Sequence, residues 1–342
     1  MSGPEPVAAL STLDGRHVLV AGCHRYADLA RLWHRSVRRD LVPALEAAGL
    51  AVEIALFCDG GTEGFDPERF PGARLIPPGP RARDFVEFYD WALAQAPDFL
   101  FLVDADVFFL DAAFPASLLP CFARPEVAGV SYLRRNRLPG VYALLARADA
   151  YRSLPPPVFA ARYEGLARWP QAVNLGPGEA AATALRARGF SLVQAEPEES
   201  EAHLADFHGT TVLRVARAVF GAAIGAARFA ALVGEKRYFA MGAYDNLLLA
   251  ALYQALFGEP FASNGAGEPC GGSLTADGLR GALAGVEDGE RRRALAAYFA
   301  RSDRAMARLA AREGIQIRPP AVMPEDWAPA GAVWTGGAAG AA

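Results

Sequence analysis

Apolar positions in the first hundred residues form short runs separated by longer amphipathic stretches. Short runs that end at Gly or Asp are typical of buried strands, and the longer stretches place apolar residues on one helical face. The predicted strands are His17–Cys23, Ala51–Cys58, Ala73–Ile76 and the run that begins at Phe99, and the predicted helices are Tyr26–Ala48 and Arg81–Gln95. This β-α-β-β-α-β order predicts an α/β sandwich with a mostly parallel central sheet between layers of helices.

The pattern changes after Asp111. Two further strands are expected in a smaller sheet, followed by a helix–strand pair and then by helices alone. In chain order these elements are Ala128–Leu133, Val141–Ala146, Glu179–Arg188, Phe190–Gln194, Val212–Val233, Tyr244–Phe257 and Gly289–Arg312. The predicted organisation is a flexible N-terminus (1–15), an α/β domain (16–212), a helical C-terminal region (213–318) and a flexible tail (319–342).

Two acids, Asp104 and Asp106, follow the apolar run Phe99–Val103. Carboxylates at the end of a buried strand are costly unless a cation or hydrogen-bond donors meet them. If the backbone stays extended, both acids project to one side and Ala105 to the other. Two hard oxygen ligands suit Mg²⁺ or Mn²⁺, whose remaining ligands commonly come from phosphate and water. The sequence therefore predicts a divalent-metal diphosphate site at the carboxyl edge of the sheet, where ligands of such folds bind.

Composition narrows the class of protein. The 342 residues are 52% hydrophobic and 21% charged, which fits a globular chain with a sizeable core. The net charge of −4 argues against a nucleic-acid partner. The four cysteines are far apart, so we expect reduced thiols in a cytoplasmic protein rather than a disulfide or zinc framework. We find no signal peptide and no run of about 18 apolar residues that would span a membrane, although peripheral membrane contact stays open.

The segment LFLVDADVFFLD resembles the D-x-D motif of GT-A-fold glycosyltransferases, and the strand–helix alternation before it is similar to the nucleotide-binding half of that fold. The resemblance implies that Asp104 and Asp106 hold a metal that bridges the diphosphate of a nucleotide sugar. Asp206-Phe-His-Gly-Thr-Thr211 is similar to a late histidine segment of the family, which implies His208 as the third metal ligand, with His203 as a nearby alternative. A mixed Asp/Asp/His site favours Mn²⁺ over Mg²⁺.

The resemblance also implies catalytic groups. Gly178–Phe190 is similar to a family segment in which an acid opens a short helix, so Glu179 would be the base that takes the proton of the acceptor. Ala180 stands where a second acid often does, which leaves open whether the reaction inverts configuration. Asp245 is interpreted either as an acid on the acceptor side or as a helix cap.

Residues at the ends of the first strands are expected to contact the donor. Asp59 would hold the nucleoside, beside the turn that follows the first strand. Arg81 and Asp84 begin the helix before the acid-bearing strand, where the family often contacts nucleotide or sugar. With the first acid of the motif, the predicted donor-binding residues are Gly22, Cys23, His24, Asp59, Arg81, Asp84 and Asp104.

The expected activity is transfer of a sugar from a nucleotide sugar, with UDP favoured by the resemblance, to an acceptor hydroxyl. The acceptor stays open among glycans, lipid-linked molecules, peptides and small molecules. Two alternatives remain. The first is a haloacid-dehalogenase-like phosphatase, whose opening motif also has this form, although that motif normally follows the first strand of its fold. The second is a GT-A domain that binds a nucleotide sugar without catalysis.

Overall fold

The computed structural model describes residues 13–59, 62–78, 85–113, 119–132, 142–159, 162–163, 174–175, 178–195, 201–207, 226–235, 237–261, 275–324 and 327. The chain divides into two compact units. Unit 1 comprises Met1–Asp206 and Arg308–Ile315, and unit 2 comprises Phe207–Ala307 and Gln316–Ala342. The domain boundary expected after residue 212 stays a prediction, and no pattern in the sequence indicates that residues 308–315 belong with unit 1.

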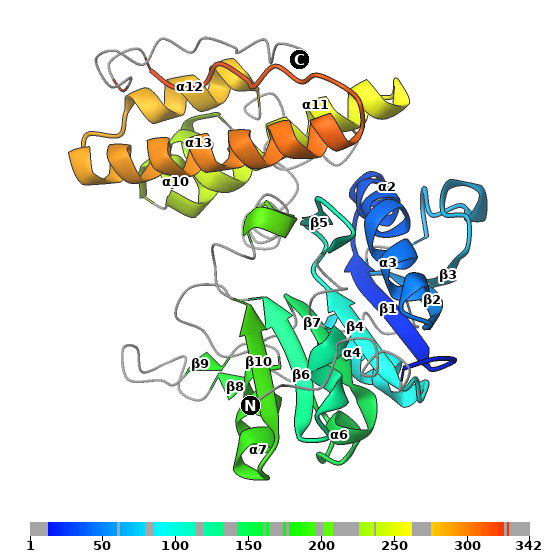
Figure 1. Ribbon diagram of the computed structural model, residues 1–342. Coiled ribbons are helices and arrows are strands. Elements are labelled where there is room, and N and C mark those ends of the chain that lie inside the picture. The colour runs from blue at the N-terminus through cyan, green and yellow to red at the C-terminus, as the bar shows by residue number, and fades with distance from the viewer. Residues whose placement is uncertain are drawn as a thin grey trace, which may run out of the picture. The chain divides into compact units, whose positions relative to one another are not determined.

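Unit 1 is built on a seven-stranded sheet with the order β10-β6-β7-β4-β1-β2-β3 (Figure 1). Its strands are β1 (His17–His24), β2 (Ala51–Cys58), β3 (Ala73–Ile76), β4 (Phe99–Val103), β6 (Val127–Tyr132), β7 (Ala143–Arg147) and β10 (Ser191–Ala195). Neighbouring strands run parallel except where β7 lies antiparallel between β4 and β6. The predicted α/β fold with a mostly parallel central sheet is therefore confirmed.

The smaller sheet expected after Asp111 is wrong for β6 and β7, which belong to the main sheet. β4 is buried along its whole length, so its edge opposite β1 needs a backbone partner. The five residues of β7 provide that partner from Phe99 to Val103. Two small sheets lie apart from the main one: β5 (Val107–Phe109) pairs with β11 (Leu204–Asp206), and β8 (Arg162–Tyr163) pairs with β9 (Asn174–Leu175).

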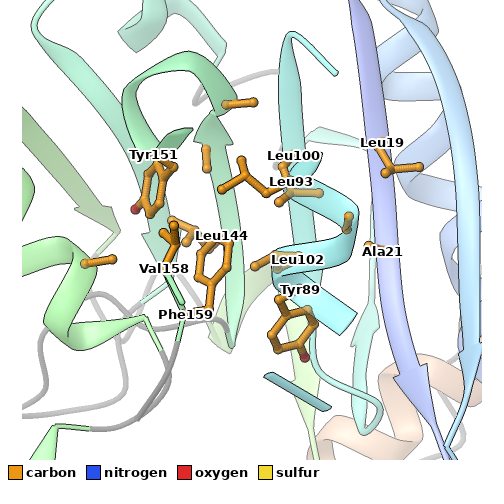
Figure 2. Packing of buried hydrophobic residues seen from close by; sticks show 14 of the residues in the cluster. Leu19, Ala21, Tyr89, Leu93, Leu100, Leu102, Leu144, Tyr151, Val158 and Phe159 are labelled. Carbon is orange, nitrogen blue, oxygen red and sulfur yellow. The ribbon is translucent and has the colours of Figure 1, made fainter. Parts of the chain in front are cut away.

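Helices cover both faces of the main sheet. Those of unit 1 are α2 (Ala27–Ser36), a π-helical segment η1 (Val37–Leu41), α3 (Val42–Ala47), α4 (Phe85–Ala94), α6 (Ala148–Arg152) and α7 (Glu179–Ala187), with 3₁₀ turns at Pro67–Arg69 and Leu119–Ala123. One face carries α4, α6 and α7, and Leu100 and Leu102 of β4 point into the core that these helices close (Figure 2). The chain crosses from β1 to β2 in one direction and from β3 to β4 in the opposite direction. Because crossovers between parallel strands are right-handed, α2 and α3 lie on the face opposite to α4.

The predicted helix Tyr26–Ala48 is one continuous helical stretch, although it contains Pro43. Proline lacks the N–H that the preceding turn would bind. The π-helical segment Val37–Leu41 ends two residues before Pro43, and such wider turns are found where the regular hydrogen-bond pattern of a helix is interrupted.

The regular secondary structure described in unit 2 is helical. It contains α10 (Ala226–Glu235), α11 (Arg237–Phe257), α12 (Ala276–Ala284) and most of α13 (Gly289–Arg312). The bounds of α13 are as predicted, whereas α11 begins at Arg237 rather than at Tyr244 and α12 was not expected. No helix in the described part of the chain is long and apolar enough to cross a membrane.

Candidate functional site

The order of the strands reverses between β1 and β4. From β1 the chain moves outward to β2 and β3, and it then returns past β1 to form β4 on the other side. The helices that follow two such neighbouring strands lie on opposite faces of the sheet, which leaves a crevice at the carboxyl ends of the strands. Ligands of open α/β sheets bind in this crevice. This topology marks the ends of β1 and β4 without reference to any motif.

The acids after β4 lie in a turn, which we call the acid turn (Asp104–Val107). The strand ends at Val103, and the N–H of Val107 donates to the carbonyl oxygen of Asp104 at 3.2 Å. The expectation of an extended backbone across Asp104 and Asp106 is therefore wrong. Asp is favoured at the first position of such turns because its short side chain can bond the local backbone. The direction of each carboxylate is set by the turn and its neighbours rather than by strand alternation.

The Tyr89 hydroxyl in α4 is affected by the charge of Asp104 and, more weakly, by that of Asp106. The Tyr89 side chain hydrogen-bonds with Asp104, while Asp106 and Cys23 also lie close enough to influence it. Burial, followed by the charge of Asp104 and the smaller effects of Cys23 and Asp106, raises the pKa of Tyr89 well above its usual value. Figure 2 shows the Tyr89 ring beyond Leu102, toward the carboxyl end of β4. The acids therefore converge at the crevice that the topology marks.

Nothing in the sequence pattern pointed to Tyr89 as a site residue. Its position in an apolar helical stripe indicated only a core residue, and its ring is indeed 2% exposed. A tyrosine in an otherwise apolar stripe is the one signal that could have singled it out, because a buried hydroxyl usually finds a polar partner.

The donor chemistry at the acid turn fits a divalent cation in part. Asp104 is half-buried and Asp106 is 5% exposed, and both offer oxygen ligands of the kind that Mg²⁺ and Mn²⁺ take. Among the described residues no group of three or more His, Cys, Asp or Glu side chains is arranged to hold a metal. The remaining ligands would come from outside that set, and His208 lies outside the described residues.

The strand that precedes His208 ends beside the acid turn. In the β5–β11 pair, Asp206 lies opposite Val107, the last residue of that turn. His203 sits at the other end of this pair, where its carbonyl accepts from the N–H of Leu110 and its Nδ1 lies 2.8 Å from the Asp111 carboxylate. Because His203 is engaged with Asp111, the structure does not favour it as a substitute for His208.

The residues predicted at the ends of β1 and β2 lie next to one another. The N–H of Asp59 donates to the His24 carbonyl at 2.8 Å, which places the end of β2 beside the end of β1. Cys23 and Asp59 are half-buried, so both reach the edge of the sheet. Arg81 and Asp84, expected on the same side, fall in a stretch that the structure does not describe.

His24 and Gly22 have a packing role that the sequence did not reveal. His24 is fully buried, and its ring meets Trp33 edge-on at 4.9 Å between centroids. Burial, and then the charge of His34, lowers the pKa of His24 to about 3, so the ring is neutral near pH 7. A Cβ at Gly22 would lie 2.8 Å from Trp33 Cζ2, which explains why glycine stands there. These contacts favour core packing over donor contact for the His24 side chain.

Glu179 is the first residue of α7 and is 7% exposed. Gly178 before it has φ = 80°, a conformation that glycine adopts readily, and its N–H donates to the Phe159 carbonyl at 3.3 Å. The Phe159 ring in turn packs against Tyr89, with 6.2 Å between centroids. The start of α7 is thus connected to the acid turn through Phe159 and Tyr89.

Asp245 lies in unit 2, inside α11, so its interpretation as a helix cap is wrong. The helix continues through Tyr244 without a break, because its start lies at Arg237. Asp245 is fully buried and accepts a hydrogen bond from the Tyr298 hydroxyl, while the neighbouring Tyr244 hydroxyl donates to Asp303. Two carboxyl groups therefore help to join α11 to α13.

Asp303 makes the stability of the protein depend on pH. Burial raises its pKa, against smaller opposing effects of the Tyr244 hydrogen bond and the Arg304 charge. Its contribution to stability is therefore complete below its ordinary pKa of 3.8 and is lost as the pH rises through the raised folded value. Asp303→Asn cannot ionise, so between about pH 4.5 and pH 7.5 we expect its melting temperature to rise relative to the wild type. Asp277→Asn, at an acid whose side chain is 89% exposed, should follow the wild type. Parallel profiles for Asp303→Asn and the wild type would contradict the assignment.

Comparisons with known proteins add little to this geometry. No family model matches the chain, and neither does any curated protein. Among solved structures, it is similar to a mannosyltransferase, PcManGT from Pyrobaculum calidifontis in complex with GDP-Man and Mn²⁺, with 14% identity, coverage of 91% of this chain and 88% of that one, and a TM-score of 0.43. It is also similar to S. aureus TarS, with 8% identity, coverage of 86% of this chain and 55% of that one, and a TM-score of 0.36. At these identities and scores, neither likeness bears on the function of this chain.

Proposed function

We propose that the chain is a metal-dependent glycosyltransferase that moves a sugar from a nucleotide-sugar donor to an acceptor hydroxyl. The observation that carries the proposal is the position of Asp104 and Asp106. They lie together at the carboxyl ends of β1 and β4, where the strand order reverses. An anionic diphosphate bound at this crevice would need a cation to offset two carboxylates, and a D-x-D pair supplies ligands for one.

In this proposal Asp104, Asp106 and His208 hold Mn²⁺ or Mg²⁺. The choice of His208 is supported by the pairing of β11 with β5, which ends at Asp206 beside the acid turn. When bound, the cation would offset the negative charge that develops on the departing nucleoside diphosphate.

The protein's own groups orient the site. Tyr89, held by the surrounding core, bonds Asp104 and thereby limits the directions that this carboxylate can take. Cys23 and Asp59, at the ends of β1 and β2, would border the nucleoside. We favour UDP from the family resemblance alone, and we assign no step to Asp245.

Glu179 is proposed as the group that accepts the proton of the attacking hydroxyl. General-base catalysis contributes roughly 10²–10⁴-fold to rate, so Glu179→Gln should lower kcat by about 100-fold or more and leave donor affinity nearly unchanged. Steady-state kinetics with the best donor, together with calorimetric titration of that donor, separates the two effects. Glu126→Gln, at an exposed glutamate before β6, is the matched control. An unchanged kcat in Glu179→Gln would remove Glu179 as the base.

The experiment that tests the function measures release of nucleoside diphosphate from a panel of nucleotide sugars with Mn²⁺, Mg²⁺ or EDTA, with and without acceptors of each class. Metal-dependent release that an acceptor accelerates is the expected result. Turnover of phosphate esters without any sugar donor would support a phosphatase instead. Donor binding without turnover across all acceptors would indicate a non-catalytic binding domain.

A further inference from the structure

The three-residue strand β5 begins at the last residue of the acid turn, and side chains from the helical stretch before β2 hold it. The N–H of Phe109 donates to Ser36 Oγ at 2.9 Å, and Arg39 Nη2 donates to the Phe109 carbonyl at 3.1 Å. The backbone N–H and carbonyl of Phe109 are therefore both held by helix side chains that do not belong to the β5–β11 sheet. The opposite edge of β5 is occupied by β11.

Arg39 is itself held by a network of charges whose two acidic side chains are buried. Its Nε donates to Asp40 Oδ2 at 2.7 Å, and its Nη1 donates to Glu313. Asp40 is fully buried and also receives Arg312 Nη2 at 2.6 Å, while Glu313 receives Arg35 Nε at 2.7 Å. The acids of this network are thus each shared by two arginines.

The network brings together parts of the chain that are distant in sequence. Ser36, Arg39 and Asp40 have the spacing that places residues on one side of a helix, here at and just before a π-helical segment, a feature often found at functional sites. Arg312 and Glu313 belong to the short stretch, residues 308–315, that begins in the last part of α13 and is grouped with unit 1. In the same stretch Arg308 Nη1 donates to the Glu201 carbonyl at 2.7 Å, close to the start of β11.

We infer that Arg39 is a positioning residue for the acid turn and that residues 308–315 form part of the metal site by holding Arg39. The inference rests on the proposed metal function of Asp104 and Asp106. A network around buried carboxylates contributes little stability relative to apolar packing, but each buried acid needs its arginines in one place, which holds Arg39 in position. Arg39 acts through β5, whose first residue follows Asp106 directly, and it touches no reacting atom.

The test compares Arg39→Met with Arg147→Met in the full chain. Arg147 is a suitable control because it also bonds backbone carbonyls, at 3.1 Å to Val127 and 2.9 Å to Phe122. It pairs with Phe99, at the end of β4 that lies away from the acid turn.

The measurements are the melting temperature without metal and the Mn²⁺ dissociation constant from electron paramagnetic resonance. Partners that orient metal ligands are worth about 10–100-fold in metal affinity. We expect Arg39→Met to weaken Mn²⁺ binding within that range, and Arg147→Met to destabilise the protein without changing Mn²⁺ affinity.

Two further variants keep the inference open to contradiction if Arg39→Met fails to fold. Ser36→Ala removes one bond to Phe109, and Glu313→Gln loosens Arg39 without altering it. Both variants should also weaken Mn²⁺ binding, by a smaller factor than Arg39→Met. Folded variants that bind Mn²⁺ like the wild type would overturn the inference and leave the proposed function standing, as would an equal loss of affinity in Arg147→Met. A wild-type chain that binds no Mn²⁺ would overturn both.

Discussion

Replacing Asp106 with asparagine is expected to abolish metal-dependent donor binding and to lower sugar transfer by more than ~100-fold, since even residues that only orient a metal ligand cost about 10–100-fold when lost. The folded state should survive. Asp104 and Asp106 lie two residues apart in one turn, so removal of one carboxylate lowers the negative charge that this turn carries when no metal is bound. We therefore expect the metal-free variant to melt no lower than the wild type.

The measurements for Asp106→Asn are the Mn²⁺ dissociation constant, the donor dissociation constant with and without Mn²⁺, and the transfer rate. Asp98→Asn is the matched control, because Asp98 lies just before the same strand at its amino end and accepts the N–H of His17 at 2.8 Å. It should retain metal binding and activity. Full activity in Asp106→Asn would show that the acid turn is not the metal site.

Replacing Trp33 with alanine is expected to destabilise the protein by about 3–5 kcal/mol, the usual cost of removing a large buried aromatic side chain. Trp33 is completely buried, its ring meets the His24 ring edge-on, and its Cζ2 lies 2.8 Å from the place that a Cβ at Gly22 would take. The cavity would open directly behind the end of β1, so we also expect donor affinity to fall secondarily.

Urea unfolding followed by circular dichroism measures the free energy of unfolding of Trp33→Ala. Trp91→Ala is the comparison, because Trp91 is only partly buried, between the Phe88 ring and the Arg74 guanidinium, and should cost less. Unchanged stability in Trp33→Ala would contradict the packing role of Trp33.

The sequence predicted those features of the fold that depend on local pattern. The strands β2 and β3 and the helix α13 have the predicted bounds, because runs of apolar residues and amphipathic periodicity record directly which side chains are buried. The expected position of the acid pair at the end of a buried strand depends on the same signal. Whether Glu179, Asp59 and His208 act as the resemblance implies stays a prediction.

Features set by contacts between distant segments could not be predicted in this way. The placement of β7 between β4 and β6 depends on which strand edge is free in the folded chain, and local pattern does not encode it. The contact between Tyr89 and Asp104 depends on how α4 is positioned along the sheet, which is set by packing between distant segments. The pairing of Asp40 with Arg312 joins residues at opposite ends of the chain, each of which looks like an ordinary charge on a helix.

The most direct test of the central claim is thermal unfolding of the wild type and Asp106→Asn with UDP, GDP, CDP, dTDP or ADP, each with Mn²⁺ or EDTA. A ligand present at about 100 times its dissociation constant adds ~2.7 kcal/mol to the free energy of unfolding. We predict this stabilisation in the wild type with one nucleoside diphosphate, only when Mn²⁺ is present, and its loss in Asp106→Asn. No stabilisation by any nucleotide, or stabilisation that needs neither Mn²⁺ nor Asp106, would contradict a metal-dependent nucleotide site at the acid turn.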